Sequence, residues 1–191
     1  MSRVEPVSCW YPIETERLLL RPYRETDFDA LLGVQTREDV TRYLLYDVKT
    51  PEQVRESLAL RMMLPPLDAD GQALTLAAEL RETGTVIGDV TLFRVSMLHQ
   101  QGEIGFVFHP DFHGHGYARE AAQAMLRVAF AELGMHRVVG RCDARNAASA
   151  ALLERLGMRR EAHFVRNENL KGEWTDELVF AILEDEQRTA R

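Results

Sequence analysis

The chain has 191 residues, a length that favours one domain, and its net charge of −7 at pH 7 argues against a general nucleic-acid binder or a protein of anionic membrane surfaces. It contains no apolar run long enough to span a membrane and no signal peptide. The two cysteines, Cys9 and Cys142, match neither a metal-site spacing nor a disulfide framework, so we expect a cytoplasmic protein.

The first half of the chain is expected to form helices and then a β-meander. Residues 1–12 show no period and are interpreted as an N-terminal arm. The clearest helix signal is the cap at Thr50, because Pro51 suits the first helical position and Gln53 can reach back to the cap. The expected elements are a strand at 17–21, a helix capped by Thr26, a short helix at 38–45, a helix from Pro51 to about Leu64, and a hairpin of strands 74–80 and 86–94.

Residues 103–120 change from strand to helix through a glycine loop. Bulky apolar residues alternate with other residues up to Pro110, which ends the strand. Gly114 and Gly116 permit a tight turn, and apolar residues recur at helical spacing from Ala118 onward. Because the first amides of a helix lack intrahelical partners, this arrangement predicts a cradle for an anion such as pyrophosphate.

The rest of the chain completes an α/β pattern. The expected elements are a strand at 137–143, a helix capped by Asn146 and stopped by Gly157, and strands at 159–165 and 177–183. The order β-α-α-β-β-β-α-β-α-β-β predicts a mixed sheet with helices on both faces. We therefore expect one three-layer α/β/α domain at residues 13–184 and a C-terminal tail at 185–191.

The glycine loop differs from two common phosphate-binding loops, because no lysine follows its second glycine and a dinucleotide loop would need a third glycine. The pattern His113-x-x-Gly116-x-Ala118 instead resembles the [Gln/Arg]-x-x-Gly-x-[Gly/Ala] loop of GCN5-related N-acetyltransferases (GNAT), with histidine at the first position. Residues 146–158 resemble that family's Asn-x-x-Ser and Leu-Gly-Phe steps. The loop motif and the Asn-x-x-Ser motif are each weak alone, but together, in the family's order and spacing, they make the resemblance strong.

Residues 13–21 and 168–176 resemble the RimJ/RimL group of ribosomal-protein alanine N-acetyltransferases, so the resemblance covers nearly the whole chain. It implies the GNAT fold, with a mixed, mostly antiparallel seven-stranded sheet whose fourth and fifth strands splay apart. The pantetheine arm of acetyl-coenzyme A (acetyl-CoA) would fill that gap. The implied cofactor-binding residues are Phe106, Val107 and Phe108 through their backbone, and His113, Gly114, His115, Gly116, Tyr117, Ala118, Arg119, Asn146 and Ser149.

The implied reaction is direct acetyl transfer. An amine must lose a proton, attack a thioester carbonyl and expel a thiolate, which needs a base and an acid and no metal. Some relatives place a glutamate and a tyrosine where this chain has Arg141 and Leu153, so that pair is absent. The RimL-like pattern implies Glu168 as the base and Ser149 as the hydrogen-bond donor to the thiolate, with Glu103 as a reserve base.

The loop also carries a rival interpretation as a zinc site, because His109, Asp111, His113 and His115 lie within seven residues. Pro110 and the two glycines leave the directions of the imidazoles unfixed, and no His-x-x-x-His pair is present. We therefore favour an anion site without a metal.

Acetylation of a primary amine is the first functional expectation. The alternatives are a non-catalytic acyl-CoA sensor and a transferase for a larger acyl group such as succinyl. A ribosomal-protein N-terminus, a polyamine, an amino acid or an antibiotic amine all fit as acceptor, and the acidic chain weakly favours a cationic one. The family resemblance further suggests a homodimer, formed near the closing strands and Trp174, without nucleic-acid or membrane partners.

Overall fold

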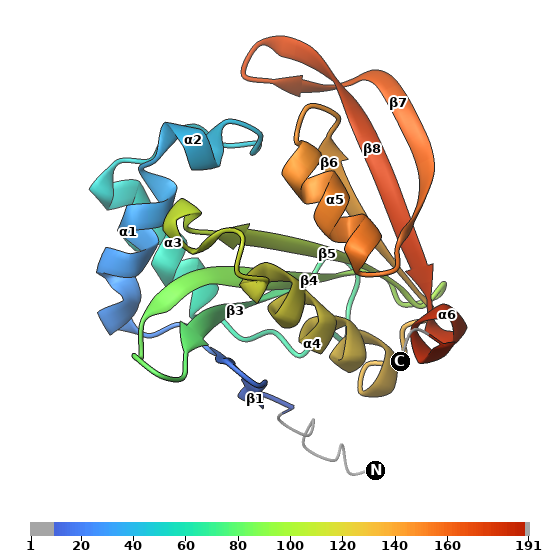
Figure 1. Cartoon of the computed structure of the whole chain (residues 1–191), viewed down its shortest axis with the longest axis horizontal. Coiled ribbons are helices and arrows are strands. Elements are labelled where there is room, and N and C mark those ends of the chain that lie inside the picture. The colour runs from blue at the N-terminus through green and yellow to red at the C-terminus, as the bar shows by residue number, and fades with distance from the viewer. Residues whose placement is uncertain (1–9, 190–191) are drawn as a thin grey trace.

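A computed structural model describes residues 10–189, which form one eight-stranded sheet with helices on both faces (Figure 1). The strand order is β1-β2-β3-β4-β5-β6-β8-β7, and all neighbours are antiparallel except β5 and β6. The strands are β1 (Ile13–Glu14), β2 (Leu18–Arg21), β3 (Ala73–Leu80), β4 (Val86–Ser96), β5 (Gln101–Phe108), β6 (Arg137–Asp143), β7 (Arg159–Leu170) and β8 (Glu173–Leu183). The predicted fold class is confirmed, with one strand more than expected; Cys9 and most of the predicted arm lie outside the described residues.

Two groups of helices cover the two faces of the sheet. Successive strand residues face opposite sides, and Leu76 packs in the cluster that contains α4 and α5 whereas Ala77 packs with α1 and α3. The helices are α1 (Phe28–Gln35), α2 (Glu38–Thr41), α3 (Pro51–Arg61), α4 (Tyr117–Ala131), α5 (Ala147–Arg155) and α6 (Glu184–Thr189). Within residues 10–189, no helix is long and apolar enough to cross a membrane.

The predicted start of a helix is confirmed where the sequence carries a complete N-terminal cap. Thr50 and Gln53 form the expected capping box at the start of α3. Thr26 is not a cap, because a 3₁₀ turn at Glu25–Asp27 precedes α1 and the Asp27 carboxylate binds the buried Arg21 guanidinium at 2.7 and 2.9 Å. Helix α2 ends at residue 41 instead of 45, and α3 ends three residues before the predicted position.

The closing strands form a longer hairpin than the sequence predicts. Strand β7 continues to Leu170 and β8 begins at Glu173, with Lys171 and Gly172 in the turn at φ values of 54° and 88°. Positive φ at both turn residues is the conformation that joins two twisted antiparallel strands by a two-residue turn. The hairpin turn and α2 lie at the same end of the molecule (Figure 1), and the predicted tail begins with α6.

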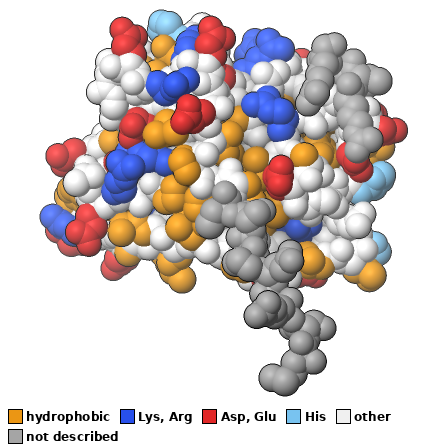
Figure 2. Space-filling view, turned by 90° about the horizontal axis from the view of Figure 1, so that it is seen from below, with side chains coloured by type: hydrophobic (Ala, Val, Ile, Leu, Met, Phe, Trp, Pro, Cys, Tyr) orange, Lys and Arg blue, Asp and Glu red, His pale blue; other side chains and the backbone are white. Residues whose placement is uncertain are grey.

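The surface is not uniformly acidic despite the net charge of −7. The face shown in Figure 2 carries separate groups of basic and acidic side chains with hydrophobic surface between them. The net charge therefore does not describe the charge at any one site.

Candidate active site

The sheet opens between its two parallel strands. Strands β5 and β6 pair only at their first three positions, where Gln101 lies opposite Arg137 and Glu103 opposite Val139. Beyond these residues β5 remains paired with β4 up to Phe108, and β6 remains paired with β8 to its end. The splay predicted between the fourth and fifth strands is therefore confirmed between β5 and β6, and it leaves two backbone edges facing each other without strand partners.

Alternation along β5 decides which backbone groups face the opening. The His109 amide donates to the Ile87 carbonyl in the direction of β4. Because neighbouring residues of a strand direct their backbone groups to opposite edges, Phe106 and Phe108 face the opening. Val107, predicted with them, instead turns its backbone groups toward β4, where it lies opposite Asp89.

The glycine loop joins β5 to α4 as predicted. A 3₁₀ turn at Pro110–Phe112 comes first, and Gly114 and Gly116 follow with φ values of 80° and 81°. Gly116 is the N-cap of α4 and supplies no side-chain cap to the helix. The first amides of α4 are thus free of intrahelical partners, which is the arrangement that binds an anion.

A residue from the first strand pair braces this loop. The Arg17 guanidinium donates to the His115 carbonyl at 2.9 Å, lies 4.6 Å from the centre of the Tyr117 ring and pairs with Glu120 at 2.7 Å. Burial raises the pKa of Glu120, but hydrogen bonds from Thr15 and Arg17 outweigh this effect and hold the pKa below its usual value. The sequence predicts Arg17 only as the first residue of a strand and gives no sign of this role, and the structure places it just before β2.

The histidines of the loop bind the local backbone. His113 Nε2 lies 2.9 Å from the Phe108 carbonyl oxygen, and His115 Nδ1 lies 2.9 Å from the His113 carbonyl oxygen. His109 Nδ1 accepts from the Asp111 amide at 3.3 Å. Within the described part of the chain, no group of three or more possible metal ligands comes together. These contacts give each imidazole a role in shaping the loop.

The start of α5 places a hydroxyl beside the opening. Asn146 caps the helix by accepting from the Ser149 amide at 3.1 Å, and Gly140 of β6 has no side chain to hold α5 away. The Ser149 hydroxyl hydrogen-bonds the thiol of Cys142, whose pKa burial raises to about 11. The thiol is therefore protonated at neutral pH.

The two candidate bases differ in their surroundings. Glu168 is half-buried on β7, and no hydrogen bond or ion pair joins its carboxylate to another described residue. Glu103 pairs with the Arg141 guanidinium at 3.2 Å, which also lies 3.4 Å from Glu177. Burial raises the pKa of Glu103 more strongly than Arg141 lowers it. No hydrogen bond between described residues joins Ser149 to either candidate.

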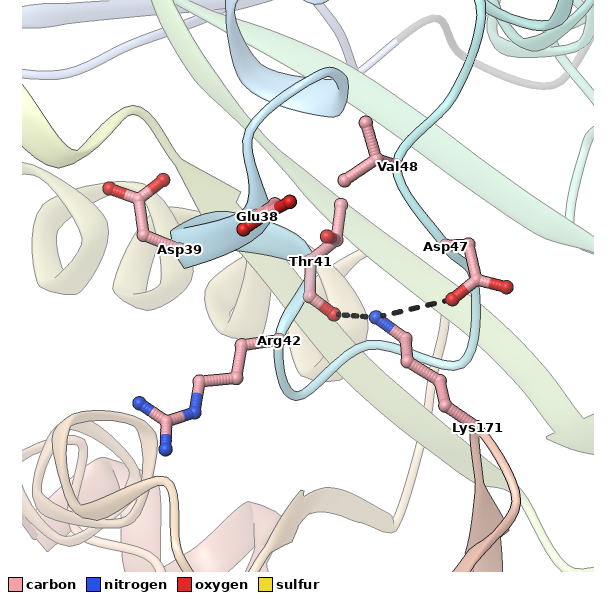
Figure 3. A pocket seen from close by; sticks show the side chains of 7 residues that line it. All are labelled: Glu38, Asp39, Thr41, Arg42, Asp47, Val48 and Lys171. Carbon is pink, nitrogen blue, oxygen red and sulfur yellow. Dashed lines mark hydrogen bonds and ion pairs between the residues drawn. The ribbon is translucent and has the colours of Figure 1, made fainter.

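A cavity of about 630 Å³ lies between α2 with its following loop and the turn of the β7–β8 hairpin (Figure 3). Lys171 at this turn donates to the Thr41 carbonyl at 2.8 Å and lies 3.7 Å from the Asp47 carboxylate. Glu38, Asp39, Arg42 and Val48 complete the lining. The cavity thus adjoins the hairpin that carries Glu168, three residues before Lys171.

Comparison with known proteins gives a consistent result. A family model described as an acetyltransferase (GNAT) domain matches residues 17–159. The uncharacterized N-acetyltransferase YnaD of Bacillus subtilis is 32% identical over 174 residues, which cover 91% of this chain and 98% of that protein. A crystal structure of a GNAT-family acetyltransferase from Bacillus anthracis has a TM-score of 0.81 at 33% identity, covering 91% of this chain and 98% of the other. The fold also matches RimL, a ribosomal alpha-N-protein acetyltransferase in complex with CoA, at a TM-score of 0.78 and 21% identity, over 92% of this chain and 98% of that one.

Proposed function

The chain belongs to the GNAT acetyltransferase family, and we propose that it transfers the acetyl group of acetyl-CoA directly to a primary amine. The observation that carries this proposal is the opening between β5 and β6, which leads directly into the glycine loop before α4. The resemblance of residues 13–21 and 168–176 to the RimJ/RimL group, and the fold shared with RimL, support membership of that branch.

The residues at the opening fit an extended thioester. The backbone edge of Phe106 and Phe108 has no strand partner on the side of β6, so it is free to bind the amide groups of a pantetheine arm. Gly114, Gly116 and the first amides of α4 would hold the pyrophosphate. Acetyl-CoA would supply an acetyl group activated as a thioester, and the Phe106 amide would donate to the acetyl oxygen as negative charge develops.

We assign Glu168 as the general base. Its carboxylate is half-buried and unbonded within the described residues, so it can accept a proton from the amine directly or through water. Glu103 is the less favoured choice because Arg141 occupies its carboxylate at 3.2 Å. A base that must first release a guanidinium is at a disadvantage, although burial raises the pKa of Glu103 and so makes its carboxylate a stronger base.

Ser149 is assigned as the donor to the departing thiolate. Its hydroxyl already hydrogen-bonds a sulfur atom, that of Cys142, at the edge of β6. The Asn146 cap fixes the first turn of α5 and therefore the position of this hydroxyl. A thiolate is a weakly basic leaving group, so a hydrogen bond can stabilise it without full proton transfer.

The cavity in Figure 3 supports access for a cationic acceptor from the side of α2. Three carboxylates line it, those of Glu38, Asp39 and Asp47, against two cations, Arg42 and Lys171. Asp39 is paired with Arg37 at 2.8 Å and Asp47 lies 3.7 Å from Lys171, whereas no ion pair engages Glu38 within the described residues. A primary amine arrives in water as an ammonium ion, which the Glu38 carboxylate can attract.

The proposal is tested by measuring release of the CoA thiol with a panel of amines and N-terminal peptides. Turnover of acetyl-CoA with at least one primary amine is expected. Tight CoA binding without turnover on any amine would favour the sensor function, and turnover of succinyl-CoA alone would favour transfer of the larger group. If CoA neither binds nor is released from any donor, the proposed activity is wrong.

We also propose a homodimer that uses the β7 edge of the sheet. β7 ends the strand order, and Phe164, Val165 and Trp174 of this hairpin are 45%, 73% and 60% exposed. Phe164 and Val165 lie on the edge strand itself and Trp174 on its neighbour β8, and exposed apolar side chains at a sheet edge favour association with another chain. Light scattering that reports a monomer at micromolar concentration would exclude this assembly.

A further inference from the structure

Strand β7 carries three residues where its neighbour β8 carries one. The pairs that flank this irregularity are Phe164 with Glu177 and Glu168 with Thr175. Residues 165–167, which we call the β7 insert, therefore stand against Asp176 alone. The insert is a bulge of two extra residues, and bulges of this kind redirect the side chains that follow them.

The insert sets the position of Glu168 on the sheet. Between the two flanking pairs β7 advances four residues and β8 advances two, so continuous pairing would have placed Glu168 opposite Glu173, at the hairpin turn. The insert moves Glu168 back by two positions, about 7 Å along the strand, toward the level at which β6 ends. Because the number of extra residues is even, Glu168 stays on the face of the sheet that carries Arg141 and Glu103.

Two carboxylates of β8 hold the insert. The Arg166 amide donates to Asp176 Oδ1 at 2.9 Å, and His163 Nε2 lies 2.7 Å from Asp176 Oδ2. Asn167 donates to the buried Glu177 carboxylate at 2.8 Å. Hydrogen bonds from the Arg166 amide and from His163 hold the pKa of Asp176 below its usual value, so its carboxylate is ionised at neutral pH. Arg166 has a φ of 51°, a conformation that a residue other than glycine keeps only when its surroundings fix it.

Asp176 acts on this backbone and not on the proposed base itself. Its neighbour Thr175 shares a face of the sheet with Glu168, so Asp176 faces the opposite side, toward α5. Glu177 also contacts Arg141, which binds the other candidate base, so a change at Glu177 would disturb both candidates. Removal of the Asp176 carboxylate therefore isolates the effect of the insert.

We propose that Asp176 is a positioning residue, which holds Glu168 in place through the backbone of the β7 insert. The inference rests on the proposed function, with Glu168 as the general base. A base must lie within hydrogen-bond reach of the amine proton, and a displacement of about 1 Å can lower the rate steeply. The hydrogen bond from the Arg166 amide fixes the residue two positions before Glu168, so it limits such displacement.

The test measures kcat with an accepted amine, and the Kd of CoA by isothermal titration calorimetry. Asp176→Ala should lower kcat about tenfold, because a loosened insert keeps the base but changes its distance to the amine, and it should leave the Kd unchanged. Asp176→Asn keeps a side-chain oxygen for the Arg166 amide and should retain kcat within about twofold. The Asp176 side chain is 34% exposed, so both variants should fold.

A double variant separates positioning from a general loss of structure. Added to Glu168→Gln, Asp176→Ala should cause no further loss of kcat, because the base that Asp176 positions is already absent. Losses that multiply in the double variant would show that Asp176 acts through the fold alone. A normal kcat in Asp176→Ala or in Glu168→Gln would also overturn the inference.

Glu161→Ala is the matched control. Glu161 lies at the other register shift of β7, between Arg160 and Ala162, and its carboxylate binds Arg137 and Arg159. This variant should lower the Tm and leave kcat unchanged. An equal loss of kcat would mean that any loosening of β7 has the same effect, which would overturn the inference and leave the acetyltransferase proposal intact. Absence of turnover in the unmodified protein would instead overturn the proposed function and the inference with it.

Discussion

Replacing Gly116 by valine perturbs the loop in two separable ways. Gly116 has a φ of 81°, a conformation in which a branched side chain costs about 1–3 kcal/mol. In a domain of this size each kcal/mol lowers the Tm by about 2–4 °C, so strain alone should lower it by roughly 2–12 °C. The new side chain also enters a cavity beside the loop and obstructs the approach of a phosphate to the backbone.

Calorimetry with and without CoA separates the two effects. At about 100 times its Kd, CoA should stabilise the unmodified protein by about 2.7 kcal/mol, a Tm increase of roughly 5–11 °C. Gly71→Val is the control, because Gly71 has the same φ of 81° and open space where its side chain would be. Both variants should lose similar stability, but only Gly116→Val should lose the response to CoA. A folded Gly116→Val protein with the full response would refute the assignment of the loop.

Three further changes test other parts of the molecule. Glu168→Gln should lower kcat by about 100-fold or more and leave the Kd of CoA unchanged. If Glu168→Gln keeps a normal kcat and Glu103→Gln loses it, the general base is Glu103. Asp27→Asn should reduce the unfolding free energy at pH 7 by about 1.5–3 kcal/mol in urea titrations, because it removes one of the two carboxylates that pair with the buried Arg21 cation and leaves only Glu79, at 2.6 Å. Burial raises the pKa of Asp27, but hydrogen bonds from Arg21 lower it by more, so the folded-state pKa is below the usual value. The stability contributed by Asp27 is therefore present above about pH 4 and is lost as the pH falls through the folded-state pKa. Equal urea midpoints for the unmodified protein and the variant at pH 7 would contradict this prediction. Lys171→Met should lower the KM of cationic acceptors about threefold with little change in kcat, because the variant removes the Lys171 ammonium group that competes with the acceptor for the carboxylates of the cavity. An unchanged KM would show that the acceptor reaches the site by another path.

The sequence predicted those parts of the site that are built from neighbouring residues. The glycine loop, the start of α4 and the Asn146 cap depend on turn and capping chemistry within a few positions, which a local pattern carries. The opening between β5 and β6 came from the family resemblance and not from any period in the residues. The orientation of Val107 followed only from the register with β4, which requires knowing which strands pair.

The β7–β8 hairpin shows why the length of an exposed strand is hard to predict from its residue pattern. Strand β7 is exposed at most positions, so its residues do not alternate between apolar and polar. Its register also shifts between Phe164 and Glu168, with Arg166 at a φ of 51°, which interrupts any two-residue period. The position of Glu168 depends on this irregular segment, so the surroundings of the proposed base could not be derived from spacing.

The bracing by Arg17 links the β1–β2 end of the sheet to the glycine loop and the first turn of α4. Arg17 and Glu120 are 103 residues apart, yet the guanidinium fixes both the first turn of α4 and the His115 carbonyl. Arg17 and Thr15 both bind the Glu120 carboxylate, so its negative charge is neutralised and does not repel a phosphate at the loop. The first two strands, β1 and β2, thereby support the proposed cofactor side of the site, whereas β7 at the other end of the sheet carries the proposed base. Acetyl transfer at the opening of the sheet would accordingly depend on the folding of both edges, and a variant that loosens β2 should weaken CoA binding without direct contact with the reacting atoms.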